Sequence, residues 1–165
     1  KLDIAVATGE CEQTRWGFEK LLHAGAATIL QPDMAYCGGP TEALKIRALA
    51  SAKGVNVVPH CWGTQLNLAC AAHFLATASV EPGRAESQAL LLEGDNSPNP
   101  MRTEIYKASV VVSGGCVQVP QGAGLGVEPD LKEMQPFCIN QTEIKNDADV
   151  SNVDRSKSGR FEQTY

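Results

Sequence analysis

The sequence lacks several signals that would assign a function at once. It has 165 residues and a formal net charge of −5, with no basic stripe or Arg-rich run, so nothing favours nucleic acid as a partner. No apolar run reaches the roughly 18 residues that a membrane span needs, so no membrane partner is expected. Its glycine-rich stretches match neither G-x-G-x-x-G nor G-x-x-x-x-G-K-S/T, which argues against a nucleotide site.

Cysteine spacing excludes the commonest structural metal site. The six cysteines contain no C-x-x-C pair, so a zinc knuckle is not expected. Their placement favours free thiols in a reducing cytoplasm. The chain opens without an initiator methionine and without the apolar region of a signal peptide. We therefore expect a cytoplasmic chain that begins inside a longer protein.

What the sequence does contain is an alternation of apolar runs and amphipathic stretches. The composition, 43% hydrophobic and 20% charged, suits a globular domain with a sizeable core. Strands are predicted over 2–7, 27–31, 55–59 and 89–92, and helices over 13–24, 41–53 and 64–78. Strands that alternate with helices predict an α/β fold with a parallel sheet and helical crossovers.

After the fourth predicted strand the pattern changes. Residues 109–120 predict a β-hairpin with a glycine turn at 113–115, followed by a second glycine-rich turn at 122–126. Residues 139–165 are polar and predict a loose tail.

Each of the four predicted strands is followed by one ionisable residue. In parallel sheets, chemistry gathers at the carboxyl ends of the strands. His60 and Asp33 follow successive strands, so their side chains can meet, and a carboxylate on one imidazole nitrogen makes the other a better base. The alternative is a structural histidine that is satisfied by a backbone carbonyl.

The two glutamates at the outer strand ends are weaker signals. Glu10 could be a magnesium ligand, because hard cations take oxygen donors, but further carboxylates would have to come from strands that this chain does not have. Glu93 could be a general acid or could orient a substrate. Either residue alone could equally be a solvated strand-end charge.

Taken together, these residues resemble a known family over about residues 1–138. The chain is similar to the C-terminal part of the enolase superfamily, in the mandelate racemase/muconate lactonizing enzyme family. It is most like the sugar-acid dehydratases and the galactarolactone cycloisomerase-like members. The stretches that carry the resemblance are collinear: Val-Ala-Thr-Gly-Glu10, Leu-Gln-Pro-Asp33, Val-Pro-His60-Cys-Trp-Gly-Thr, Leu-Leu-Leu-Glu93 and Asn-Pro-Met-Arg102.

The resemblance implies a fold and a division of labour. Residues 1–107 would form strands five to eight of a (β/α)₈ barrel. Residues 108–138 would close it against a capping domain, and 139–165 would be a flexible tail. His60 would be the base or acid, Asp33 its orienting partner and Glu93 a substrate contact or proton donor.

The same resemblance implies cofactor, substrate and assembly. Glu10 would bind Mg²⁺ together with ligands that this chain lacks, and the substrate would be a small carboxylate, a sugar acid. The parent enzyme would form a homo-oligomer. A full barrel takes roughly 250 residues, so we expect this chain to be a fragment that is inactive alone.

Three alternatives remain open at this point. The parent could be a racemase or epimerase of the same superfamily. The chain could be a non-catalytic half-barrel that only associates with a partner. It could also be a different α/β sheet with a flavodoxin-like strand order, although the phosphate-binding loop that such a protein needs is not found.

Overall fold

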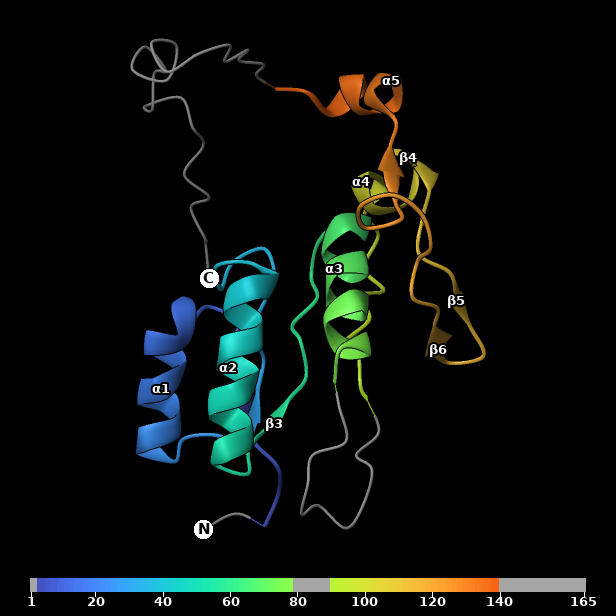
Figure 1. Ribbon diagram of the computed structural model, residues 1–165. Coiled ribbons are helices and arrows are strands. Elements are labelled where there is room, and N and C mark those ends of the chain that lie inside the picture. Colours follow the sequence, from blue (N-terminus) through green and yellow to red (C-terminus); the bar gives the residue numbers. More distant parts are fainter. Residues whose placement is uncertain (1–2, 79–89, 140–165) are drawn as a thin grey trace. The chain divides into compact units, whose positions relative to one another are not determined.

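The computed structural model describes residues 3–78 and 90–139. The chain divides into two units, Lys1–Met134 and Gln135–Tyr165, of which the first holds nearly all the described elements (Figure 1). In chain order the elements are β1 (Ala7–Thr8), α1 (Thr14–Ala24), β2 (Ile29–Leu30), α2 (Pro40–Ala52), β3 (Asn56–Val57), α3 (Gln65–Ala76), α4 (Pro100–Thr103), β4 (Tyr106–Ala108), β5 (Val112–Ser113), β6 (Cys116–Val117), β7 (Glu128–Pro129), α5 (Leu131–Met134) and the 3₁₀ turn η1 (Gln135–Phe137).

The first three strands form a parallel sheet in the order β1-β2-β3. The predicted strand–helix alternation is therefore confirmed through α3. Backbone pairing continues past the strands themselves, since the His60 amide donates to the Pro32 carbonyl at 3.2 Å and Asp33 and His60 form a parallel bridge. This extension brings the residues after β2 and β3 together at one edge of the sheet.

The helices α1, α2 and α3 begin and end within two residues of the predicted bounds. Gly25 adopts φ +59 and ends α1. Its backbone N–H donates to the Leu22 carbonyl and that of Ala26 donates to the Leu21 carbonyl, which are the two hydrogen bonds of a Schellman motif. Pro40 occupies the first turn of α2, where its missing N–H costs nothing. Helices α1 and α2 pack side by side against the sheet (Figure 1).

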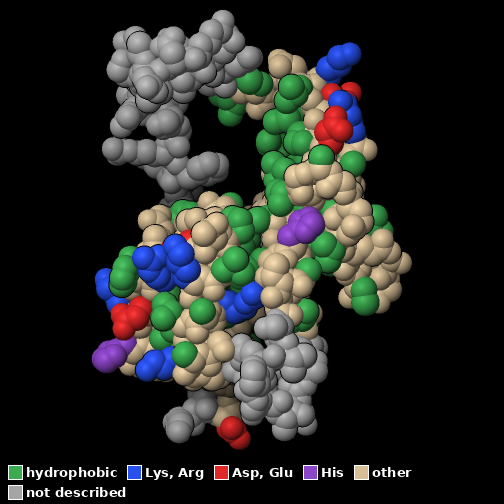
Figure 2. All heavy atoms as spheres, in the orientation of Figure 1, with side chains coloured by type: hydrophobic (Ala, Val, Ile, Leu, Met, Phe, Trp, Pro, Cys, Tyr) green, Lys and Arg blue, Asp and Glu red, His purple; other side chains and the backbone are tan. Residues whose placement is uncertain are grey.

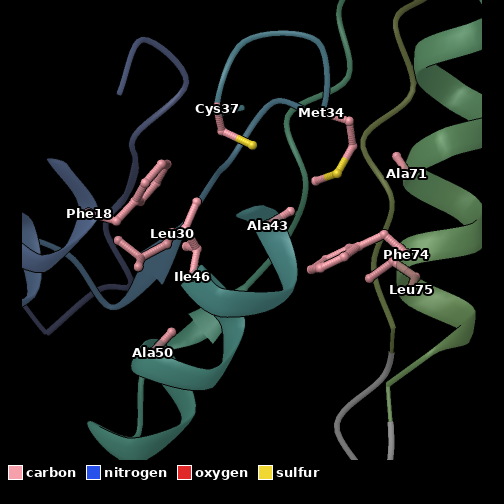
Figure 3. Packing of buried hydrophobic residues seen from close by; sticks show 10 residues of the cluster. All are labelled: Phe18, Leu30, Met34, Cys37, Ala43, Ile46, Ala50, Ala71, Phe74 and Leu75. Atoms are coloured by element: carbon pink, nitrogen blue, oxygen red, sulfur yellow. The ribbon is translucent and has the colours of Figure 1, made fainter. Parts of the chain in front are cut away.

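The core lies between the sheet and its helices (Figure 3). Its buried members come from α1, β2 and the loop after it, α2 and α3: Phe18, Leu30, Met34, Cys37, Ala43, Ile46, Ala50, Ala71, Phe74 and Leu75. The Phe74 ring points from α3 toward α2 and joins the third helix to this cluster. The buried stripe of α2 packs this crossover helix against the parallel pair β2–β3, the two strands that Asp33 and His60 follow.

The fourth predicted strand, over 89–92, is wrong for the residues that the structure describes. Residues 90–92 form no strand, and residue 89 lies outside the described part. A run of three leucines reads as a buried strand, but Leu90 and Leu91 are each 58% exposed and only Leu92 packs on the core. Without burial on both faces, the run has no reason to extend along β3.

Two further details differ from the prediction at the start of the chain. The first strand is confined to Ala7–Thr8, and Ile4 and Val6 before it are exposed. A large ring on an amphipathic helix usually faces the core, yet Trp16 on α1 is 64% exposed and the Arg15 guanidinium stacks over its ring. Ile4 and Val6 reach the surface because, among the described residues, β1 has a neighbour on one side only.

The closing segment contains the predicted hairpin. Strands β5 and β6 pair antiparallel across Gly114 and Gly115, both at positive φ, as a primed turn requires. Strands β4 and β7, which precede and follow this hairpin in the sequence, form a second antiparallel pair. The predicted tail lies outside the described residues from 140 onward, and the boundaries at 107 and 138 stay predictions. None of the described helices is long and apolar enough to cross a membrane.

Candidate active site

Three of the four predicted site residues follow successive parallel strands. Glu10 comes after β1, Asp33 after β2 and His60 after β3. The carboxyl ends of parallel strands meet at one edge, so the sheet gathers these side chains although the chain spreads them over some fifty positions. The prediction that His60 and Asp33 meet is confirmed, while their chemical role stays a prediction.

His60 and Asp33 form a close pair. Nδ1 of His60 lies 2.7 Å from Oδ2 of Asp33. An ionised carboxylate can only accept, so the shared hydrogen belongs to Nδ1 and leaves Nε2 with its lone pair. The imidazole is oriented as a general base with Nε2 as the proton-accepting atom.

Asp33 is itself held by donors on its other sides. It is 6% exposed, and its Oδ1 accepts from the Ala35 amide at 2.7 Å. The Asn67 side-chain amide donates to both carboxylate oxygens, at 3.1 Å to Oδ1 and 3.2 Å to Oδ2. A buried carboxylate needs such partners, because burying an ion without hydrogen bonds is costly.

Asn67 is the site residue that the sequence reasoning missed. It stands in the first turn of α3, a helix otherwise rich in Ala and Leu, and it is 7% exposed. A signal was present in the sequence, because an Ala- and Leu-rich helix packs on more than one side and a polar amide on such a helix needs a partner.

Glu10 lies on the other side of the imidazole. Its Oε2 is 3.4 Å from Nε2 of His60, and its side chain is 59% exposed. Gly9, directly before it, has φ +118, and a Cβ there would stand 2.6 Å from Cε1 of Phe18. The tight turn at Gly9 therefore lets the chain leave β1 over the Phe18 ring and present Glu10 beside His60.

Glu93 reaches the same region without belonging to a strand. Its Oε2 accepts from the Cys61 amide at 3.1 Å, next to His60. The loop that follows is closed by Arg102, which bonds the Asp95 carboxylate and the Ser97 carbonyl. The predicted convergence of Glu93 with the pair is thus reached by a side-chain bond rather than by strand pairing.

The Cys61 thiol shows how acidic these surroundings are. Burial, with smaller contributions from the carboxylates of Asp33, Glu93 and Asp95, raises the pKa of this thiol to about 12, while Arg102 acts in the opposite direction. The thiolate is the nucleophilic form, so a thiol with this pKa is inert near neutral pH. Cys61 fills space beside the pair and carries no chemistry.

The donor set does not fit a complete metal site. Among residues 3–78 and 90–139, no group of three or more His, Cys, Asp or Glu side chains could hold a metal ion. Glu10 is an oxygen donor of the kind Mg²⁺ takes, but Mg²⁺ demands octahedral coordination and Glu10 supplies one side chain. The described residues are an acid–base pair with a single exposed carboxylate beside it.

A family comparison matches this arrangement. Residues 1–134 match the family described as enolase C-terminal domain-like. The chain belongs to this family. The resemblance to the enolase superfamily and to its mandelate racemase group is confirmed, and with it an enolase C-terminal domain-like α/β fold.

Two curated relatives of this enolase-family chain are sugar-acid enzymes by name. It is 41% identical over 134 residues to the D-galactarolactone cycloisomerase of Agrobacterium fabrum, covering 81% of this chain and 35% of that protein. It is 36% identical over 137 residues to the L-rhamnonate dehydratase of Saccharopolyspora erythraea, covering 81% and 33%.

A solved structure of a related enzyme is also similar in fold. The crystal structure of the 3,6-anhydro-D-galactonate cycloisomerase from Zobellia galactanivorans superposes with a TM-score of 0.72 at 32% identity, over 82% of this chain and 36% of that one. This enolase-family chain spans about a third of the length of the relatives that it matches.

Proposed function

We propose that this chain carries the acid–base residues of an enolase-superfamily enzyme that removes the proton α to the carboxylate of a sugar acid. Dehydration or cycloisomerisation would follow that step, in line with the names of the two curated relatives. One observation carries the proposal: His60 Nδ1 lies 2.7 Å from a buried Asp33 carboxylate.

In this proposal each residue has a distinct task. His60 takes the α-proton at Nε2, while Asp33 keeps the hydrogen on Nδ1 and stabilises the imidazolium that forms. Glu93, anchored by the Cys61 amide, hydrogen-bonds the substrate carboxylate or donates a proton to the leaving group.

We further propose that the parallel strands β1 to β3 belong to the C-terminal half of a (β/α)₈ barrel. The parallel order, the helical crossovers and the gathering of side chains at the carboxyl edge support this proposal. We expect the 165-residue chain alone to show no turnover, because such a barrel builds its site from loops of all eight units. The parent enzyme is expected to be a homo-oligomer.

Magnesium and location remain part of the proposal. Glu10 is the residue of this chain that we expect to bind Mg²⁺, with its other ligands supplied from outside the chain. The proton transfer proposed for His60 uses its own Nε2 and the Asp33 carboxylate. The cytoplasmic location rests on the six cysteines, three of which are buried or half-buried: Cys37, Cys61 and Cys70.

Two alternatives stay testable. A racemase or epimerase of the superfamily would use a second acid/base on the opposite face of the substrate. A half-barrel that only associates is favoured by a different observation, the exposed Ile4 and Val6 beside β1, an edge strand of the described sheet. Association without exchange of a substrate proton would favour that alternative.

The test is α-proton exchange from a panel of sugar acids in deuterated buffer with Mg²⁺. The chain is assayed alone and mixed with the segment of the Agrobacterium fabrum cycloisomerase that precedes its matched region. We expect exchange only in the mixed sample, and none from that segment alone. A folded complex, shown by size-exclusion chromatography and circular dichroism, that exchanges no substrate would contradict the proposed function.

A further inference from the structure

We propose that Asn67 is a positioning residue for the His60–Asp33 pair, which holds the Asp33 carboxylate where it keeps the hydrogen of His60 on Nδ1. This inference rests on the proposed function, since it adds a member to the proposed base. It assigns a role in proton transfer to a residue that touches neither the substrate nor the imidazole.

The contacts of Asn67 point to Asp33 alone. Its Nδ2 lies 3.1 Å from Oδ1 and 3.2 Å from Oδ2 of that carboxylate. The ionised carboxylate only accepts, so the NH₂ end of the amide must face it and the carbonyl end must face away. The amide thus bridges both oxygens and opposes rotation of the carboxylate about its broad terminal torsion.

The other end of the amide argues against a purely structural role. Among the described residues, Oδ1 of Asn67 is the one buried side-chain polar atom without a hydrogen-bond partner. An unsatisfied buried oxygen destabilises a fold, and a leucine of nearly the same shape would carry no such atom. In a helix rich in Ala and Leu, the gain that offsets this loss is the bond to Asp33.

The backbone places Asn67 for this task. The chain passes from His60, just beyond β3, into α3 within a few residues. The backbone N–H of Asn67 donates to the Thr64 carbonyl at 3.1 Å in the first turn of that helix. Two residues earlier on the same helix, Gln65 is also a buried amide, but its Oε1 accepts from the Val110 amide at 3.0 Å. Gln65 therefore provides a matched control that does not touch the pair.

The first test reads the tautomer directly in the full chain. With ¹⁵N-labelled histidine there are only three imidazoles to assign, and H60N identifies that of His60. At a pH where the ring is neutral, we expect the Nδ1–H form to predominate in the wild type and in Q65M. In N67L we expect a mixture of the two tautomers. An unchanged tautomer in N67L, or a wild-type ring protonated on Nε2, would overturn the inference.

The second test uses the exchange assay on the mixed sample. Loss of a residue that orients a functional histidine costs about 10- to 100-fold, so we expect N67L to lower kcat by that factor with little change in KM. Q65M should keep kcat. The urea midpoints of both variants show whether each is folded. N67L should lower the midpoint, because it takes a donor from the buried Asp33 carboxylate, so kcat is compared under conditions where both variants are folded.

The two tests separate the inference from the proposed function. A tautomer shift in N67L, in a protein that exchanges no substrate proton in any mixture, would support the positioning role and defeat the proposed activity. Exchange that survives N67L at the wild-type kcat would defeat the positioning role and leave the activity standing.

Discussion

His60 Nδ1 and Asp33 Oδ2 are 2.7 Å apart although 27 positions separate the two residues in the sequence. One strand–helix–strand unit produces this distance. Strands β2 and β3 pair in parallel, and the pairing continues beyond them to a parallel bridge between Asp33 and His60. With an ionised carboxylate and a neutral ring, this bond places the hydrogen on Nδ1 and leaves Nε2 available to a substrate.

Asp33→Asn should uncouple the pair without opening a cavity. An amide can face the imidazole with its oxygen or with its NH₂ group, so it no longer favours the Nδ1–H tautomer. It also carries no negative charge to stabilise the imidazolium. We expect the exchange rate in the mixed sample to fall by about 10²-fold or more, which is within the range of general acid–base effects. The control is Asp130→Asn, because the Asp130 carboxylate accepts from the Lys132 amide instead. An equal loss in both variants would contradict the account.

Alkaline pH should destabilise the fold through its buried thiols. Burial raises the pKa of Cys37 from 9.0 to about 11 and that of Cys61 to about 12. A raised folded-state pKa gives stability that is complete below the unfolded pKa near 9 and is lost as pH rises through about 11 to 12. Urea midpoints measured across this range should fall less steeply in Cys61→Ala than in the wild type.

The exposed Cys116 supplies the control for this experiment. Cys116→Ala should leave the pH dependence of the urea midpoint as in the wild type, because this substitution removes no buried thiol. If both alanine variants flattened the curve equally, burial of Cys61 would not be the cause.

Gly9→Ala should disturb the site more than Gly25→Ala. Both glycines adopt positive φ, but a Cβ at Gly9 would stand 2.6 Å from the Phe18 ring, whereas nothing lies within 4 Å of one at Gly25. We expect Gly25→Ala to cost about 1 kcal/mol of unfolding free energy and Gly9→Ala more, through the added clash. Urea unfolding of the two variants decides, and equal losses would refute a packed turn at Gly9.

Ile46→Ala should test the packing that spaces β2 from β3. Ile46 is fully buried on α2, and removing its side chain should cost about 2–5 kcal/mol. Leu44 on the same helix is 42% exposed, so Leu44→Ala should cost about 1 kcal/mol or less. Denaturant titration of both variants measures the difference, and a similar cost would mean that the core is not where the structure puts it.

The sequence predicted the parts that depend on periodicity. The three helices, the parallel sheet of the first three strands and the meeting of His60 with Asp33 all follow from local pattern and the rule for parallel strands. It failed over 89–92, because three consecutive leucines do not reveal whether a partner strand exists. Asn67 was missed for the opposite reason: a single amide shows its importance only once its partner is known.

The measurement that tests the central claim most directly is deuterium incorporation at the α-carbon of a sugar acid by the mixed sample, with His60→Asn compared against His73→Asn. His73 lies in the last turn of α3, where its Nε2 contacts the Leu125 carbonyl, so the His73→Asn substitution should leave exchange intact. The account predicts that only His60→Asn abolishes incorporation. Exchange that persists in a folded complex carrying His60→Asn would contradict His60 as the base.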